Sequence, residues 1–186
     1  MWPGLSLQPL RWETILALSL IHILSINLGD TVRYSQNGLS TVSSWQVDNK
    51  INYAFDGGVD IAGAAVQWLR DKLRIIWNSA ETENIASSVQ DTGGLYFVPA
   101  FSGLAAPHWD QYARGMMIGI TGGTSREHIV RAVLESIAFQ VYDNAQVMEQ
   151  DSGYEKIVGS KIAYIKTFNF TRENYSEVLK QYRQND

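Results

Sequence analysis

Residues 115–135 read GMMIGITGGTSREHIVRAVLE. The stretch opens with an apolar segment typical of a buried strand, and Thr121-Gly122-Gly123 then interrupts it. Thr124 and Glu127 have the spacing of a capping box, so we expect a helix to begin at Thr124. Behind this cap, apolar residues recur in a wide stripe at helical spacing. The pattern predicts a long helix that packs deep against a sheet and ends near Gly153.

Upstream of this stretch, two segments have the composition of strands. Residues 40–47 and 50–55 are rich in β-branched and aromatic side chains. Asp48-Asn49 lies between them and predicts a two-residue hairpin turn, because both residue types tolerate left-handed backbone angles. We expect Asp56-Gly57-Gly58 to break the second strand.

Helices and further strands are expected between this hairpin and residue 115. Asp60 is suited to cap an amphipathic helix over residues 61–77, and residues 80–89 predict a shorter second helix. Residues 95–101 and 115–120 are short apolar runs suited to buried strands. Because strands and helices alternate, the chain is expected to be an α/β domain with one mixed sheet flanked by helices.

The composition excludes several classes of protein. The chain has 186 residues, of which 45% are hydrophobic and 18% charged, as in a globular domain. A net charge of -4 and the lack of a basic stripe argue against a nucleic-acid partner. Cysteine is absent, which excludes disulfides and thiolate metal sites and fits a cytoplasmic protein.

Both ends of the chain differ in character from the middle. Residues 14–28 (TILALSLIHILSINL) form an apolar run that could be a signal or anchor, a buried helix or strand, or sequence foreign to the fold. A membrane segment is disfavoured, because the run is short and no cleavage site follows it. We therefore divide the chain into an apolar leader of uncertain status (1–28), a main domain (29–153) and a divergent tail (154–186). The tail predicts a strand near 157–168 and a short helix near 175–182.

Gly63 and Gln67 are the candidate binding residues. They lie one turn apart on the same face of the helix expected over residues 61–77. A glycine lets a ligand approach the backbone closely, and an amide can both donate to and accept from a ribose or a base. The alternative is that Gly63 serves helix–sheet packing and Gln67 is merely solvated.

Other catalytic arrangements are poorly supported. The sequence contains neither a Walker phosphate loop nor a dinucleotide-binding glycine fingerprint. Three histidines lack the spacing of metal ligands, namely His22, His108 and His128. Ser102, His108 and Asp110 could be imagined as a hydrolase site, but the short loop offers no nucleophile elbow.

Four motifs resemble the glycerol kinases of the FGGY carbohydrate kinase family. They are NYA at 52–54, AGAAVQWLRD at 62–71, TGGLYFVPAFSGL at 92–104, and residues 115–135, which are similar to the family's second signature throughout. The resemblance implies a partial actin-like ATPase (ribonuclease H-like) domain, the C-terminal half of a kinase. It further implies ATP with Mg²⁺ as cofactor, glycerol as substrate, and nucleotide contacts at Gly63 and Gln67.

The resemblance does not cover a whole kinase. The polyol-binding residues, phosphate loop and catalytic aspartate of the family have no counterpart, and Asp30 is not placed to act as the base. The Gly-Thr-Gly turn and the adenine-site motif expected after Gly153 are also missing. Smaller departures fall at His108, Gln111 and Gly122. We therefore assign no catalytic residue and expect a chain that is inactive alone. The alternative is a non-catalytic nucleotide-binding or interaction module that associates with a full-length kinase or with itself.

Overall fold

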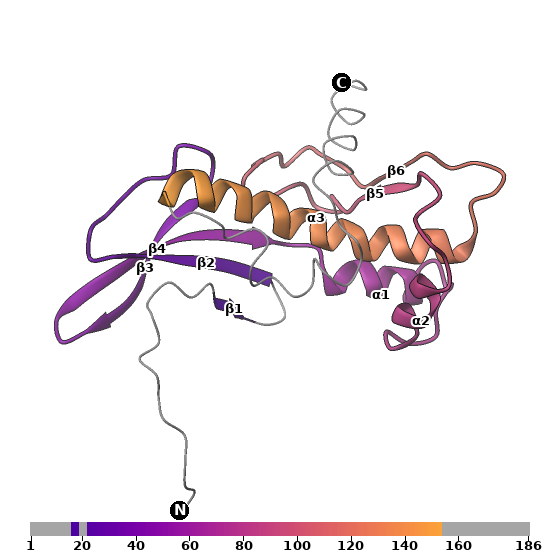
Figure 1. Ribbon diagram of the computed structural model, residues 1–186, viewed down its shortest axis with the longest axis horizontal. Coiled ribbons are helices and arrows are strands. Elements are labelled where there is room, and N and C mark those ends of the chain that lie inside the picture. Colours follow the sequence, from indigo (N-terminus) through magenta and orange to yellow (C-terminus); the bar gives the residue numbers. More distant parts are fainter. Residues whose placement is uncertain (1–15, 19–21, 154–186) are drawn as a thin grey trace, which may run out of the picture.

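The computed structural model describes residues 16–18 and 22–153 (Figure 1). A four-stranded sheet has the order β1-β2-β4-β3, and a separate two-stranded sheet pairs β5 with β6. Neighbouring strands are antiparallel in both. The elements are β1 (Leu16–Leu18), β2 (His22–Gly29), β3 (Ser40–Val47), β4 (Lys50–Val59), α1 (Gly63–Asp71), α2 (Glu81–Ser87), β5 (Tyr96–Val98), β6 (Met116–Ile118) and α3 (Arg126–Ser152). The expected α/β class is confirmed, but the described strands form two separate antiparallel sheets and not the one mixed sheet that was expected.

The long helix α3 organises the molecule. It crosses one face of the four-stranded sheet and continues past α1, α2 and β5 (Figure 1). Its predicted end is confirmed, since Gly153 follows it in a left-handed conformation with φ 73°. None of the helices in the described part of the chain has the length and apolarity needed to span a membrane.

The hairpin between β3 and β4 is confirmed with its turn. Asp48 and Asn49 have φ values of 49° and 61°, and Val47 pairs with Lys50. Two central residues with positive φ match a type I′ turn, whose twist agrees with that of the flanking strands. The turn sequence therefore accounts for the register next to the turn, and a register shift follows between Ser43 and Trp45.

The expected break at Asp56-Gly57-Gly58 is wrong, because β4 continues through it to Val59. Leu24 of β2 pairs with Gly57, so the glycines lie within the sheet. A Cβ added to Gly57 would lie 2.2 Å from Oδ1 of Asn144 on α3. The glycine is needed for the close approach of α3 to the sheet, not for a turn.

The predicted helix starts also need correction. α1 begins at Gly63 after Ala62, without a side-chain cap from Asp60. α3 begins at Arg126 with Ser125 as the cap, and the Ser125 amide donates to Nδ1 of His128 at 3.1 Å. Thr124 does not cap α3 because its hydroxyl accepts from the Thr121 amide in the preceding turn.

The first helix is shorter than its apolar pattern suggested. α1 ends at Asp71 instead of residue 77, and Arg74 then has a left-handed φ of 56°. Ile76 is nevertheless buried, because the loop returns it to the same core as Leu69. The apolar spacing that predicted a longer helix therefore reflects the burial of Ile76 in this core, not helical backbone at that position. The second helix is confirmed as α2, and the two short strands are present as β5 and β6, each shorter than expected.

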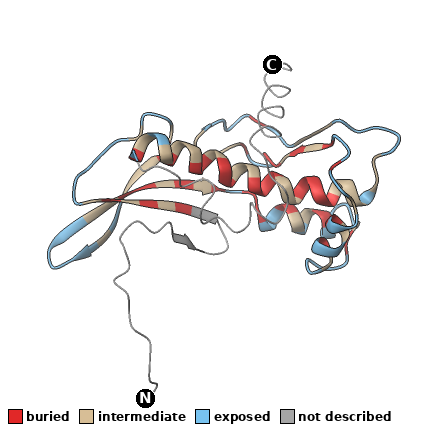
Figure 2. Cartoon of the chain, in the orientation of Figure 1, coloured by how far each residue is buried: buried red, intermediate tan, exposed pale blue. Residues whose placement is uncertain are grey.

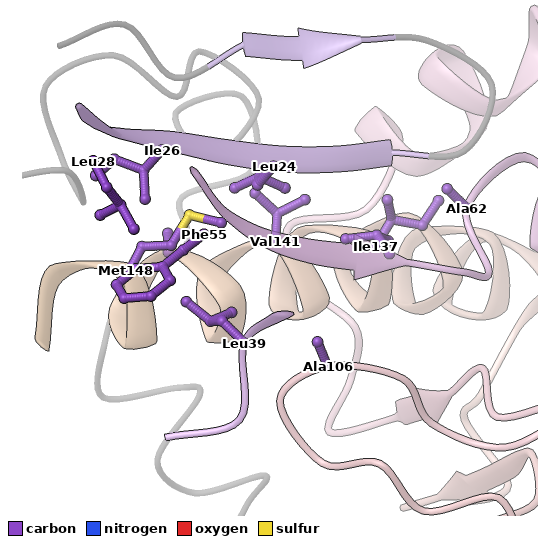
Figure 3. Packing of buried hydrophobic residues seen from close by; sticks show 12 residues of the cluster. Leu24, Ile26, Leu28, Leu39, Phe55, Ala62, Ala106, Ile137, Val141 and Met148 are labelled. Atoms are coloured by element: carbon purple, nitrogen blue, oxygen red, sulfur yellow. The ribbon is translucent and has the colours of Figure 1, made fainter. Parts of the chain in front are cut away.

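Two apolar clusters form the core. One lies between the four-stranded sheet and α3, and Figure 3 shows Leu24, Ile26 and Leu28 of β2 facing Val141 and Met148. The other joins α1, α2 and β5 to the first half of α3.

The apolar run at 14–28 was predicted to be a signal or anchor, a buried helix or strand, or sequence foreign to the fold. In the structure, its residues from His22 onward belong to the strand β2, which ends at Gly29. The strand and helix expected in the tail lie outside the described residues.

The loop before β3 is tied to the end of α3. Arg33 Nη1 donates to the Ser152 carbonyl at 3.2 Å. The Asp151 carboxylate accepts from the Ser35 hydroxyl, the Asn37 side chain, and the amides of Gln36 and Asn37 at 3.1 and 3.2 Å. Burial alone would raise the pKa of Asp151, but these hydrogen bonds lower it below its ordinary value.

We expect Asp151→Asn to destabilise the protein by about 1 kcal/mol at neutral pH, because the new amide faces donors that need an acceptor. A lowered pKa in the folded state stabilises the protein above the pKa of the unfolded state. That contribution is lost as the pH falls through the folded-state pKa. Urea unfolding should therefore show a deficit relative to wild type that shrinks below about pH 4. A deficit that is constant with pH would contradict the role of the charge.

Candidate functional site

The candidate site is the exposed face of α1. Gly63 and Gln67 are both exposed, while Ala65 and Leu69 on the opposite face are buried in the second cluster (Figure 2). The two candidates are thus brought to one surface, one turn apart. Gly63 opens the helix, so its amide belongs to the first turn, where N–H groups lack intrahelical acceptors.

The space around Gly63 tests the alternative that this glycine is needed for packing between the helix and the sheet. A Cβ built there meets no atom within 4 Å. Packing against the rest of the described protein therefore does not require a glycine at this position, in contrast to Gly57. Among the described residues, no atom crowds the exposed Gly63 at the first turn of α1.

An aromatic cluster fixes the orientation of α1. Trp68 stacks on Phe97 of β5 with ring centroids 5.5 Å apart and an interplanar angle of 9°. Phe101 packs against both rings, at 5.4 Å from Trp68 and 6.0 Å from Phe97. Because Trp68 adjoins Gln67, this cluster sets the direction in which the exposed face points.

A planar ion pair lies at the end of the same face. Arg70 Nε lies 2.6 Å from Asp71 Oδ1, and Nη2 lies 3.0 Å from Oδ2. The hydrogen bonds from Arg70 lower the pKa of Asp71. Sequence reasoning did not single out this pair, although Arg70 follows Gly63 by seven positions and Gln67 by three, spacings that share a helix face.

The loop between β5 and β6 is structural and does not form a hydrolase site. His108 Nε2 lies 3.2 Å from Oδ2 of Asp143 on α3, not next to Asp110. Asp110 accepts from the amides of Tyr112 and Ala113. Burial raises the pKa of Asp143, and the hydrogen bond to His108 opposes the rise. These partners leave Ser102 without an activating base.

No metal centre is formed by protein side chains in the described ranges, 16–18 and 22–153. No group of three His, Cys, Asp or Glu residues there is arranged to hold an ion. Asp30 is exposed in the turn after β2, where its carboxylate accepts from the Thr31 hydroxyl at 3.4 Å.

Residues 27–166 match the C-terminal domain of the FGGY family of carbohydrate kinases. Glycerol kinase 2 of Thermotoga maritima is 59% identical over 129 residues, which cover 69% of this chain and 26% of the relative. A glycerol kinase of Thermoanaerobacter pseudethanolicus is 54% identical over 158 residues, with 83% of this chain and 31% of the relative covered. The chain thus spans only about a quarter to a third of the length of these relatives.

Solved kinases have the same fold. The crystal structure of Plasmodium falciparum glycerol kinase with ADP is 41% identical, with a TM-score of 0.66 over 73% of this chain and 27% of that one. A ligand-bound xylulose kinase of Lactobacillus acidophilus is 25% identical, with a TM-score of 0.59 over 69% of this chain and 26% of that one. The expected partial actin-like architecture agrees with these structures.

Proposed function

Because the chain belongs to the FGGY family of carbohydrate kinases, matching its C-terminal domain, we propose that it forms part of the nucleotide-binding half of a cytoplasmic glycerol kinase. The reaction is transfer of the γ-phosphoryl group of ATP to a hydroxyl of glycerol. The observation that carries the proposal is the open, exposed face of α1 with Gly63 and Gln67. Magnesium, when bound with ATP, neutralises charge on the phosphates.

In this function the chain binds and orients the nucleotide. Gly63 allows the nucleotide to lie against the helix backbone, and the Gln67 amide donates to and accepts from its ribose or base. Phosphoryl transfer depends mainly on positioning and charge stabilisation, so a rigid helix held by the Trp68 cluster is a suitable support.

The proton from glycerol must be accepted by a base, and we assign none to this chain. Two partly buried carboxylates among the described residues already have partners: Asp143 contacts His108, and Glu135 accepts from Arg131. We therefore propose that catalysis requires regions of the longer kinases that this chain does not span. The purified chain alone should give no glycerol 3-phosphate.

A non-catalytic interaction module is the second candidate. Several large apolar or aromatic side chains are exposed, including Trp77 at 88%, Tyr112 at 79% and Tyr34 at 76%. Exposed side chains of this kind occur where proteins associate. In this case the chain would bind a full-length kinase or a second copy of itself.

We expect ATP with Mg²⁺ to bind this chain weakly, with a dissociation constant of roughly millimolar, because one wall of a site gives few contacts. Gly63→Val should abolish this binding, and Gln67→Ala should weaken it roughly three- to ten-fold through the lost hydrogen bonds. The measurement is a nucleotide titration followed by the NMR shifts of the Gly63 amide and the Gln67 side chain.

Gln46→Ala, an exposed glutamine on the distant hairpin, is the matched control and should leave ATP binding unchanged. A wild-type chain that is folded but shows no shift at either position would contradict the nucleotide site. A coupled assay with glycerol and Mg-ATP tests the second part of the proposal. Turnover above background would mean that a carboxylate of this chain acts as the base.

A further inference from the structure

The exposed face of α1 extends beyond the two predicted residues. Gly63, Gln67 and Arg70 are exposed positions of one helix, separated by four and three residues. Such spacings place side chains above one another along a single face. At a rise of about 1.5 Å per residue, Arg70 lies about 10 Å along the axis from Gly63. A nucleotide laid along the face from Gly63 past Gln67 would reach it.

The Arg70 guanidinium is held in a fixed plane. Adjacent residues on a helix do not normally face each other, yet Arg70 and Asp71 share two parallel hydrogen bonds of 2.6 and 3.0 Å. This fork uses Nε and Nη2 and leaves Nη1 free of the Asp71 carboxylate. The side chain remains 43% exposed. Arg70 therefore differs from nearby Arg74, for which no carboxylate partner is found among the described residues.

The ion pair favours a base over a phosphate as the ligand of Arg70. Asp71 already occupies the edge formed by Nε and Nη2, and its negative charge offsets that of the guanidinium, which weakens the attraction of a phosphate to the remaining Nη1/Nη2 edge. A planar face remains, and arginine planes stack on the π faces of nucleic-acid bases. The chemistry that fits is the base of a nucleotide.

We propose that Arg70 is a specificity-determining residue that stacks on the purine base of the bound nucleotide, with Asp71 as the residue that positions it. This inference rests on the proposed nucleotide function of the same face. Because the contact involves only the base, it distinguishes ATP from inorganic tripolyphosphate, which carries the phosphates without a nucleoside.

The test compares the two ligands on wild type, Arg70→Ala, Arg70→Lys and Asp71→Asn. Arg70→Ala should weaken ATP binding about two- to five-fold and leave tripolyphosphate binding unchanged. Arg70→Lys should restore little of the lost ATP binding, because an ammonium group has no plane that can stack on a base. Asp71→Asn should also lower the preference for ATP, by a smaller factor. Arg74→Ala is the matched control and should resemble wild type with both ligands.

Two results for Arg70→Ala would overturn the proposed stacking contact. Equal loss of ATP and tripolyphosphate binding in Arg70→Ala would make Arg70 a simple charge site and overturn the stacking contact. Unchanged ATP binding in Arg70→Ala, with a lower urea midpoint, would reduce the pair to a stabilising surface contact. Both results presuppose that wild type binds ATP at Gly63 and Gln67. If wild type does not bind ATP there, the proposed function itself fails and the inference fails with it.

Discussion

Gly57→Ala is expected to destabilise the protein by about 2–3 kcal/mol, although alanine is normally tolerated in a strand. The new Cβ would lie 2.2 Å from Oδ1 and 2.8 Å from Cγ of Asn144. Asn144 cannot move away freely, because it is 1% exposed and its Nδ2 donates to the carbonyls of Gly58 and Gln140 at 3.2 and 3.0 Å. Either α3 shifts from the sheet or these bonds break. Urea unfolding measures the loss.

The neighbouring glycine is the matched control for this prediction. A Cβ at Gly58 meets only the Asp60 carboxylate, at 3.2 Å, so Gly58→Ala should cost much less than Gly57→Ala. A double-mutant cycle with Asn144→Ala isolates the contact. The Gly57→Ala penalty should largely disappear in the Asn144→Ala background. If it persists there, the clash with Asn144 is not its cause.

The same contact shows why part of the fold could not be predicted from the sequence. The hairpin turn at Asp48-Asn49 and the end of α3 at Gly153 depend on local backbone preferences, and both were predicted. The path of β4 depends on Gly57 meeting Asn144, which is far away in the chain. Two consecutive glycines are locally indistinguishable from a turn signal, so the strand was expected to end there.

Prediction of the candidate site was limited in a similar way. Helical periodicity was enough to place Gly63 and Gln67 on one exposed face of α1. Their role as nucleotide contacts remains a prediction from family resemblance. The pair formed by Arg70 and Asp71 was missed, because adjacent helix residues are not expected to bond. The spacing from Gly63 to Arg70 was the available signal.

Arg131→Ala is expected to cost about 3–4 kcal/mol, because it removes one partner of a largely buried ion pair together with its contacts to α2. Arg131 is 9% exposed and donates to Glu135 at 2.8 Å. Its Nη1 also donates to the carbonyls of Ala86 and Val89 at 3.4 and 2.9 Å, which holds α2 against α3. The substitution leaves these carbonyls and the Glu135 carboxylate without their donor. Urea unfolding at neutral pH measures the effect.

The pH dependence separates the buried charge from lost packing. Burial raises the pKa of Glu135 above its ordinary value, and the hydrogen bond and charge of Arg131 oppose this rise. A carboxyl whose pKa is raised on folding favours the folded state when protonated, and this stabilisation is lost as the pH rises through the unfolded-state and then the folded-state pKa. Without Arg131 the pKa rises further, so the deficit of Arg131→Ala should shrink on acidification from neutral pH toward about pH 5.

The double variant Arg131→Ala/Glu135→Gln removes the titrating carboxyl group. Like Arg131→Ala, it also lacks the packing contacts of Arg131. Its deficit relative to wild type should be smaller than that of Arg131→Ala at neutral pH, because no charge is left unpaired. It should not shrink on acidification, and it should grow slightly as wild-type Glu135 takes up its proton. If Arg131→Ala and the double variant behave alike at every pH, the large cost comes from the contacts of Arg131 with α2, and Glu135 is not stranded as a charge.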